Sequence, residues 1–191
     1  MGNFYTNYTV KGASRPELIK LLSYRESIVS PEVKGVVVVF DKESDTQEPS
    51  VIEALGRRIS KQLSCVVFSV INHDDDILAY ELIREGHVED EYDSSPEYFD
   101  FEFKSESPTG PKGGNQVKLC EIFGVGEQEK IEKILRGGIE DYVFAFERHQ
   151  ELFEALGLPS YGVGSCYESF ENDELPEGLK LEEVTFTNRS R

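Results

Sequence analysis

The chain has 191 residues, with 37 acidic side chains against 20 basic ones and a formal net charge of −17. A chain of this length can bury a substantial core as one domain, and its negative charge repels phosphate backbones and anionic membrane surfaces. Direct nucleic-acid binding is therefore not expected, and no apolar run approaches the length that spans a membrane.

The first elements follow from short local signals. Residues 4–10 are rich in aromatic and β-branched side chains and predict a strand. Ser14 and Glu17 form a capping box that starts a helix. A short strand over 27–30 then leads into the apolar run 36–40, which predicts a buried strand.

The centre of the fold is predicted around this run. Ser50 and Glu53 indicate a second capping box and a helix over 50–63, followed by an apolar strand over 65–71. Continuous apolar runs are typical of strands that are covered on both faces. The order strand, helix, strand, strand, helix, strand predicts an α+β fold whose N-terminal half has the ferredoxin-like arrangement, with both helices on one face of an antiparallel sheet.

The two apolar strands run in the same direction, so Asp41 and His73 emerge at the same end of the sheet. In the ferredoxin-like arrangement the first strand separates them, and their ends lie about 10 Å apart. If the two strands were instead direct neighbours, these side chains could meet. The sequence leaves both alternatives open.

An acidic hairpin follows. Leu78, Tyr80 and Leu82 alternate with polar residues, Glu85 and Gly86 turn the chain, and a return strand begins near residue 88. Residues 74–106 contain 13 acidic side chains and two basic ones. Such a block is typical of a solvated face, and it can also serve as a surface for a basic partner. The predicted partner-binding residues are Glu89, Asp90, Glu91 and Asp93.

The C-terminal part is predicted to contain helices over 117–123, 127–135 and 141–156, and two strands over 162–170 and 179–187. Residues 105–115 have the composition of a linker, which indicates a loop or a subdomain boundary. We otherwise expect a single domain over 1–191.

An alternative interpretation of the hairpin entrance is chemical. His73, Asp74 and Asp76, with His87 as a further ligand, could hold a divalent cation, and Asp41 could act as a base. The structural alternative is a polar loop that opens a hairpin. The glycine motifs lack the residues of nucleotide-binding loops, so no cofactor is expected.

Three stretches resemble a family of uncharacterised bacterial proteins of similar length, namely residues 2–9, 72–76 and the pair 147–149 with 156–159. The resemblance implies a bacterial single-domain protein. Because the family has no assigned activity, it implies no site residues.

The sequence thus favours an intracellular binding, regulatory or immunity-type protein that presents its acidic face to a basic protein partner. Its three cysteines are odd in number and widely spaced, which indicates a reducing, cytoplasmic setting. The alternative is a metal-dependent hydrolase of a phosphate or similar ester. Whether the protein is an enzyme, and its oligomeric state, are left open at this stage.

Overall fold

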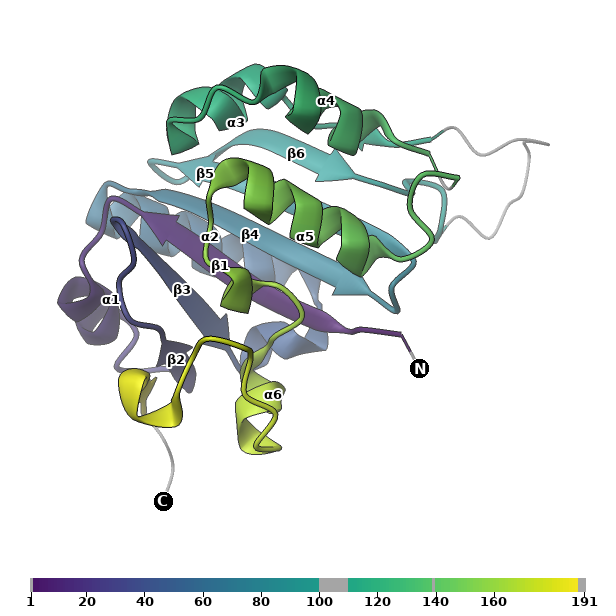
Figure 1. The fold of residues 1–191 in the computed structure, drawn as a ribbon. Coiled ribbons are helices and arrows are strands. Elements are labelled where there is room, and N and C mark those ends of the chain that lie inside the picture. Colours follow the sequence, from purple (N-terminus) through teal and green to yellow (C-terminus); the bar gives the residue numbers. More distant parts are fainter. Residues whose placement is uncertain (1, 100–109, 139, 189–191) are drawn as a thin grey trace.

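The computed structural model describes residues 2–99, 110–138 and 140–188. Within these residues, eight strands form one sheet in the order β7-β6-β5-β4-β1-β3-β2-β8 (Figure 1), and every neighbouring pair is antiparallel. The strands are β1 (Tyr5–Lys11), β2 (Ser27–Val29), β3 (Val36–Asp41), β4 (Val66–His73), β5 (Ile77–Arg84), β6 (His87–Asp93), β7 (Lys112–Gly113) and β8 (Thr185–Thr187). The prediction of a mixed α+β fold is confirmed.

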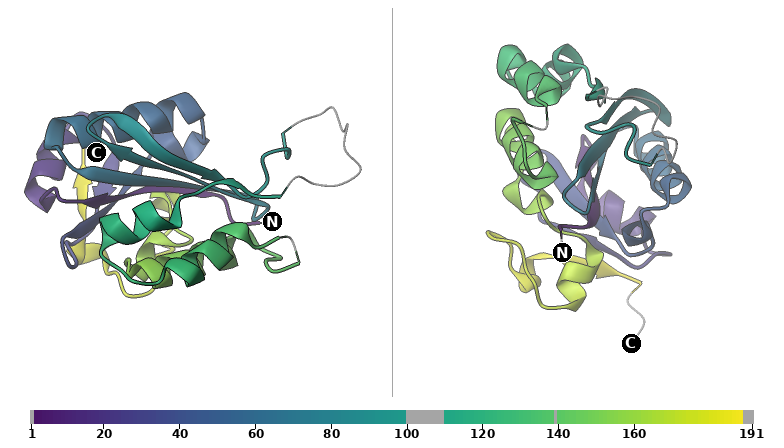
Figure 2. Two further views of the ribbon diagram at one scale, coloured as in Figure 1. Left: turned by 90° about the horizontal axis from the view of Figure 1, so that it is seen from above. Right: turned by 90° about the vertical axis from the view of Figure 1, so that its right-hand side faces the viewer.

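Helices cover both faces of the sheet (Figure 2). They are α1 (Arg15–Leu21), α2 (Pro49–Leu63), α3 (Gln116–Phe123), α4 (Gln128–Arg136), α5 (Ala145–Leu156) and α6 (Tyr167–Glu171). Helices α1 and α2 pack on one face, whereas α3 to α6 pack on the other. None of these helices, in the part of the chain that the structure describes, is long and apolar enough to cross a membrane.

The apolar runs form interior strands, as predicted. All six residues of β3 are buried, and four successive residues of β4, Val67–Val70, are buried as well. Strand β1 lies between β3 and β4 and is antiparallel to both. Consequently β3 and β4 run in the same direction but are not neighbours, which decides between the two alternatives that the sequence left open.

The predicted start of the helix over 50–63 is wrong by a small margin. The helix begins at Pro49, which places Ser50 inside the first turn, where its hydroxyl donates to Glu48 Oε1 at 3.2 Å. Glu53 instead accepts from Arg57, one helical turn later, at 2.7 Å. The capping box between Ser14 and Glu17 does form, with the Ser14 amide donating to the Glu17 carboxylate at 3.0 Å.

The predicted strand over 162–170 is also wrong. This stretch contains the end of a short 3₁₀ turn, Ser160–Gly162, and helix α6. The Asp45 carboxylate accepts hydrogen bonds from the amides of Tyr167 and Glu168 at the start of α6, and so a distant residue stabilises the helix start. Of the predicted strand over 179–187, only Thr185–Thr187 forms β8, which pairs with β2.

The loop that carries the predicted subdomain boundary is described only in part. Residues 105–109 lie outside the described residues, and within 110–115 strand β7 pairs with the end of β6.

The helix predicted over 141–156 is α5, which begins later than predicted, at Ala145.

Candidate functional site

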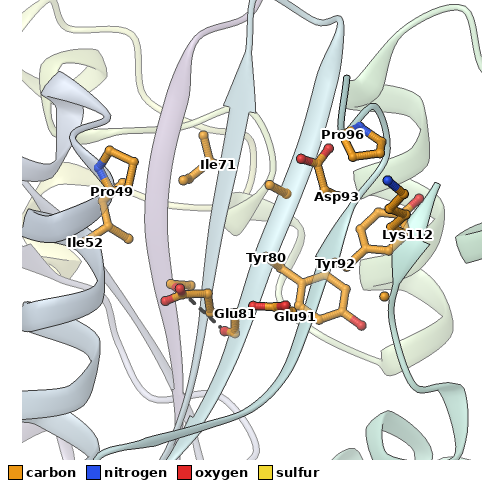
Figure 3. A pocket seen from close by; sticks show the side chains of 13 residues that line it. Pro49, Ile52, Ile71, Tyr80, Glu81, Glu91, Tyr92, Asp93, Pro96 and Lys112 are labelled. Atoms are coloured by element: carbon orange, nitrogen blue, oxygen red, sulfur yellow. Dashed lines mark hydrogen bonds between the residues drawn. The ribbon is translucent and has the colours of Figure 1, made fainter. Parts of the chain in front are cut away.

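An open groove lies on the face of the sheet that α2 covers only in part (Figure 3). Its volume is about 390 Å³. Helix α2 forms one wall through Pro49 and Ile52, and the segment around Pro96, Lys112 and Gly113 forms the other. Strands β4, β5 and β6 form the floor between the two walls.

Strand alternation decides which side chains face the groove. On β5, Leu78, Tyr80 and Leu82 belong to the core beneath α3 to α5, which leaves Ala79 and Glu81 on the groove side. The floor consists of two adjacent rows across the sheet. One row contains Ser69, Glu81 and Glu91, and the other contains Ile71, Ala79 and Asp93.

Three carboxylates therefore gather over a floor that is partly apolar. Burial raises the pKa of the Glu81 carboxyl above its ordinary value, Glu53 raises it further, Arg57 lowers it, and Glu91 raises it. The Oε2 atom of Glu81 is shielded from solvent and has no hydrogen-bond partner among the residues that the structure describes. Titratable groups perturbed by burial inside a hollow mark a candidate functional site.

Asp93 is the third carboxylate. Burial raises its pKa, while a hydrogen bond from the Ser95 amide and the charge of Lys112 lower it. Lys112 faces Asp93 across β6 and β7, and among the described residues that line the groove it is the only basic one. The groove therefore has an excess of negative charge.

The four predicted partner-binding residues do not share one surface. Glu91 and Asp93 line the groove. Asp90 lies on the opposite face, where its Oδ2 accepts from the Tyr80 hydroxyl at 2.8 Å and the Asn115 amide at 2.9 Å. Glu89 falls at the irregular point in the β5–β6 pairing, and its carboxylate lies 3.9 Å from Arg84.

The residues of the alternative metal site are not all brought together, although His73 Nε2 lies 4.0 Å from Asp74 Oδ2. His73 ends β4, whereas His87 begins β6 at the far end of the hairpin. With about 3.3 Å per residue along β5, more than 20 Å separates them. No group of three or more histidine, cysteine, aspartate or glutamate side chains in the described residues is arranged to hold a metal ion.

The loop residues have structural contacts instead. His73 Nδ1 lies 2.7 Å from Gln47 Oε1, and its ring contacts Phe4 and Phe99. Asp74 is exposed and adopts a left-handed backbone conformation at the turn, with φ of 53°. Asp76 accepts from the Tyr98 hydroxyl at 3.0 Å.

Asp41 is also held in a structural network. It is fully buried, and both of its oxygens accept from the Arg25 guanidinium, at 2.8 and 2.6 Å. The hydroxyls of Ser27 and Ser44 donate to the same carboxylate, each at 2.8 Å. A carboxylate whose oxygens are all engaged, and which solvent does not reach, is poorly suited to accept a proton from a substrate.

Other hollows offer less specific chemistry. One of about 420 Å³ is lined by the buried Arg148, but that guanidinium donates to the Ile134 and Gly137 carbonyls and to the Tyr92 hydroxyl. Arg148 therefore ties the end of α4 to β6 and is not free for a ligand. The groove over β4, β5 and β6 remains the best candidate site.

Glu81, Ser69 and Lys112 were not predicted as site residues. The sequence did contain a signal for Glu81, because this residue occupies a polar position in an alternating strand, and the strand that pairs with it in the predicted hairpin is acidic. Lys112 carried none, because its place beside Asp93 depends on the short β7 pairing.

No family model, curated protein or solved structure matches this chain. The resemblance to bacterial proteins therefore stays a prediction.

Proposed function

We propose that the protein is a binding protein that receives a positively charged segment of a protein partner in the groove. The observation that carries this proposal is the charge of the groove. Among its described lining residues, Glu81, Glu91 and Asp93 outnumber the one basic residue, Lys112. Pro49, Ile52, Ile71 and Ala79 add apolar surface, which suits the aliphatic part of long basic side chains.

The overall charge supports the same kind of partner. A net charge of −17 attracts basic partners over long range and speeds their association. The same charge disfavours nucleic acids and anionic membranes. A regulatory or immunity-type role toward a basic protein is consistent with this preference.

A reducing, intracellular location is part of the proposal. Its support is that Cys65, Cys120 and Cys166 are all buried and none forms a disulfide.

We also propose that the first six elements constitute a ferredoxin-like unit. Its support is the order β4-β1-β3-β2, with antiparallel neighbours and with α1 and α2 on one face. In this view β5 and β6 extend the unit at its β4 edge, and the extension creates the groove.

The binding function can be tested with hexalysine as a probe. Titration of the ¹⁵N-labelled protein is expected to shift amide signals of β4, β5 and β6 and to weaken as salt increases. The variant Glu91→Gln with Asp93→Asn is expected to lose most of this response. A matched control replaces Glu129 and Glu132, which are exposed on α4, with glutamine. If both variants lose the response to hexalysine equally, the response depends only on the net charge of the protein, and the proposed site is wrong.

A further inference from the structure

We propose that the pair Glu81 and Glu91 is the anchor of the groove and that it binds an arginine side chain of the partner. This inference rests on the proposed binding function and specifies its ligand. Glu81 and Glu91 lie directly opposite each other on β5 and β6, on the groove side of the sheet (Figure 3).

The first argument is charge compensation. Asp93 has Lys112 across the strand pair, and Glu53 has Arg57 at 2.6 Å. Within the described part of the chain, no ion pair involves Glu81, Glu91 or Asp93. Asp93 nevertheless has Lys112 directly opposite, whereas the residues opposite Glu81 are Ser69 and Glu91. Glu81 and Glu91 are therefore the acids of the groove whose negative charge is paired with no neighbouring basic side chain that the structure describes.

Arg57 does not fill that role. Its guanidinium is bound to the Glu53 carboxylate, and it also donates to the Gly86 carbonyl at 2.6 Å. Although the charge of Arg57 acts on Glu81, one oxygen of Glu81 is shielded from solvent and lacks a hydrogen-bond partner among the described residues. An incoming donor would satisfy that oxygen once the Glu81 side chain turns it toward the groove.

The second argument concerns the shape of the cation. Two carboxylates at facing positions offer several acceptors within a short span, which suits the planar fork of donors on a guanidinium. A guanidinium also sheds water more easily than an ammonium, which favours it at a half-buried site. The neighbouring row, Ile71 and Ala79, offers apolar contact for the methylene groups of the side chain.

The test uses four peptides that differ at one position, acetyl-Gly-Ser-Xaa-Lys-Ser-Gly-amide, where Xaa is arginine, lysine, citrulline or norleucine. We expect the arginine peptide to bind about tenfold more tightly than the lysine peptide. Citrulline keeps the shape of arginine without its charge and should bind more weakly than lysine.

The variants locate the anchor. Glu91→Gln and Glu81→Gln should each abolish the preference for arginine, whereas Asp93→Asn should weaken the arginine and lysine peptides equally. Glu91 is exposed, so its replacement tests the anchor even if the Glu81 variant folds poorly.

The outcomes separate the two proposals. Equal binding of arginine and lysine by the wild-type protein, lost in Glu91→Gln, would overturn the arginine anchor and leave the binding function intact. A preference for arginine that survives in Glu91→Gln would place the anchor elsewhere. Absence of binding by both charged peptides, and by hexalysine, would overturn both proposals.

Discussion

Glu81 and Glu91 face each other across β5 and β6, on the side of the hairpin that forms the groove. Like charges at directly opposite positions of an antiparallel pair destabilise the sheet. In this protein the repulsion between Glu81 and Glu91 acts at an open surface of the sheet, and a bound cation would reduce it. The arrangement suggests that the groove gives up some stability in favour of binding.

The first prediction is that Glu81→Gln stabilises the free protein by roughly 0.5 kcal/mol at neutral pH. Because the folded-state pKa of Glu81 is raised, folding favours the protonated carboxyl. That favourable contribution is complete below the ordinary glutamate pKa and is lost as the pH rises through the folded-state value. The advantage of the variant should therefore disappear near about pH 4.

Urea unfolding of both proteins at acidic and neutral pH measures this difference. Glu132→Gln on the exposed face of α4 is the control and should change stability little. Destabilisation by Glu81→Gln at neutral pH would contradict the prediction, because it would mean that the carboxylate makes a favourable bond.

The acidic hairpin was predictable, but the face of each acid was not. The turn at Glu85 and Gly86 places Arg84 opposite His87, and regular pairing from there would set Glu81 opposite Asp90. The irregularity at Leu82 and Ile83 shifts the register by one residue, so that Glu81 meets Glu91. A one-residue shift exchanges the faces of all later side chains, and no local sequence feature marks this bulge.

The second prediction concerns the interior strands. Val38 is fully buried on β3, in the cluster that α6 covers. Replacing it with aspartate would bury an unpaired carboxyl, at a cost comparable with the stability of a whole domain. Val38→Asp is therefore expected to abolish cooperative unfolding in circular dichroism.

Val143→Asp provides the matched control, because Val143 is 71% exposed and should tolerate the charge. Near wild-type melting of Val38→Asp would contradict the assignment of β3 to the interior.

The strands β3 and β4 were predicted correctly and helix α6 was not, and this difference has a physical cause. Strands β3 and β4 are buried on both faces, and apolar runs of this kind are visible in a sequence. Helix α6 has only five residues, and Asp45, more than a hundred residues earlier, binds its first amides. A short helix that depends on a distant partner leaves little local signal.

The third prediction separates the structural role of Asp41 from a catalytic one. Asp41→Asn would leave the largely buried Arg25 with only the exposed Glu43 as a countercharge and is expected to cost about 3 kcal/mol of unfolding free energy. Urea denaturation measures this cost. Asp173→Asn, at an exposed turn, is the control and should have little effect. A small loss for Asp41→Asn would reopen the hypothesis that this carboxylate serves chemistry.

The last prediction concerns His149, whose Nδ1 lies 2.7 Å from the Tyr5 hydroxyl inside the core. Burial lowers the pKa of His149 to about 3, so the ring is neutral in the folded protein. The Tyr5 hydroxyl also accepts from the Asn72 amide at 3.4 Å, and the direction of its bond with Nδ1 depends on which ring nitrogen carries the proton.

Because unfolding releases His149 to its ordinary pKa near 6.5, the unfolded state gains a proton below that pH. The unfolding free energy should fall by about 2 kcal/mol for this residue between pH 6.5 and pH 5, and it should change little above pH 7. His149→Gln should reduce that pH dependence, even if it lowers stability at pH 7. His87→Gln, at an exposed position, is the control. If the His149 ring signals in the folded protein titrate near pH 6 by NMR, the ring is not held neutral by burial and the prediction is wrong.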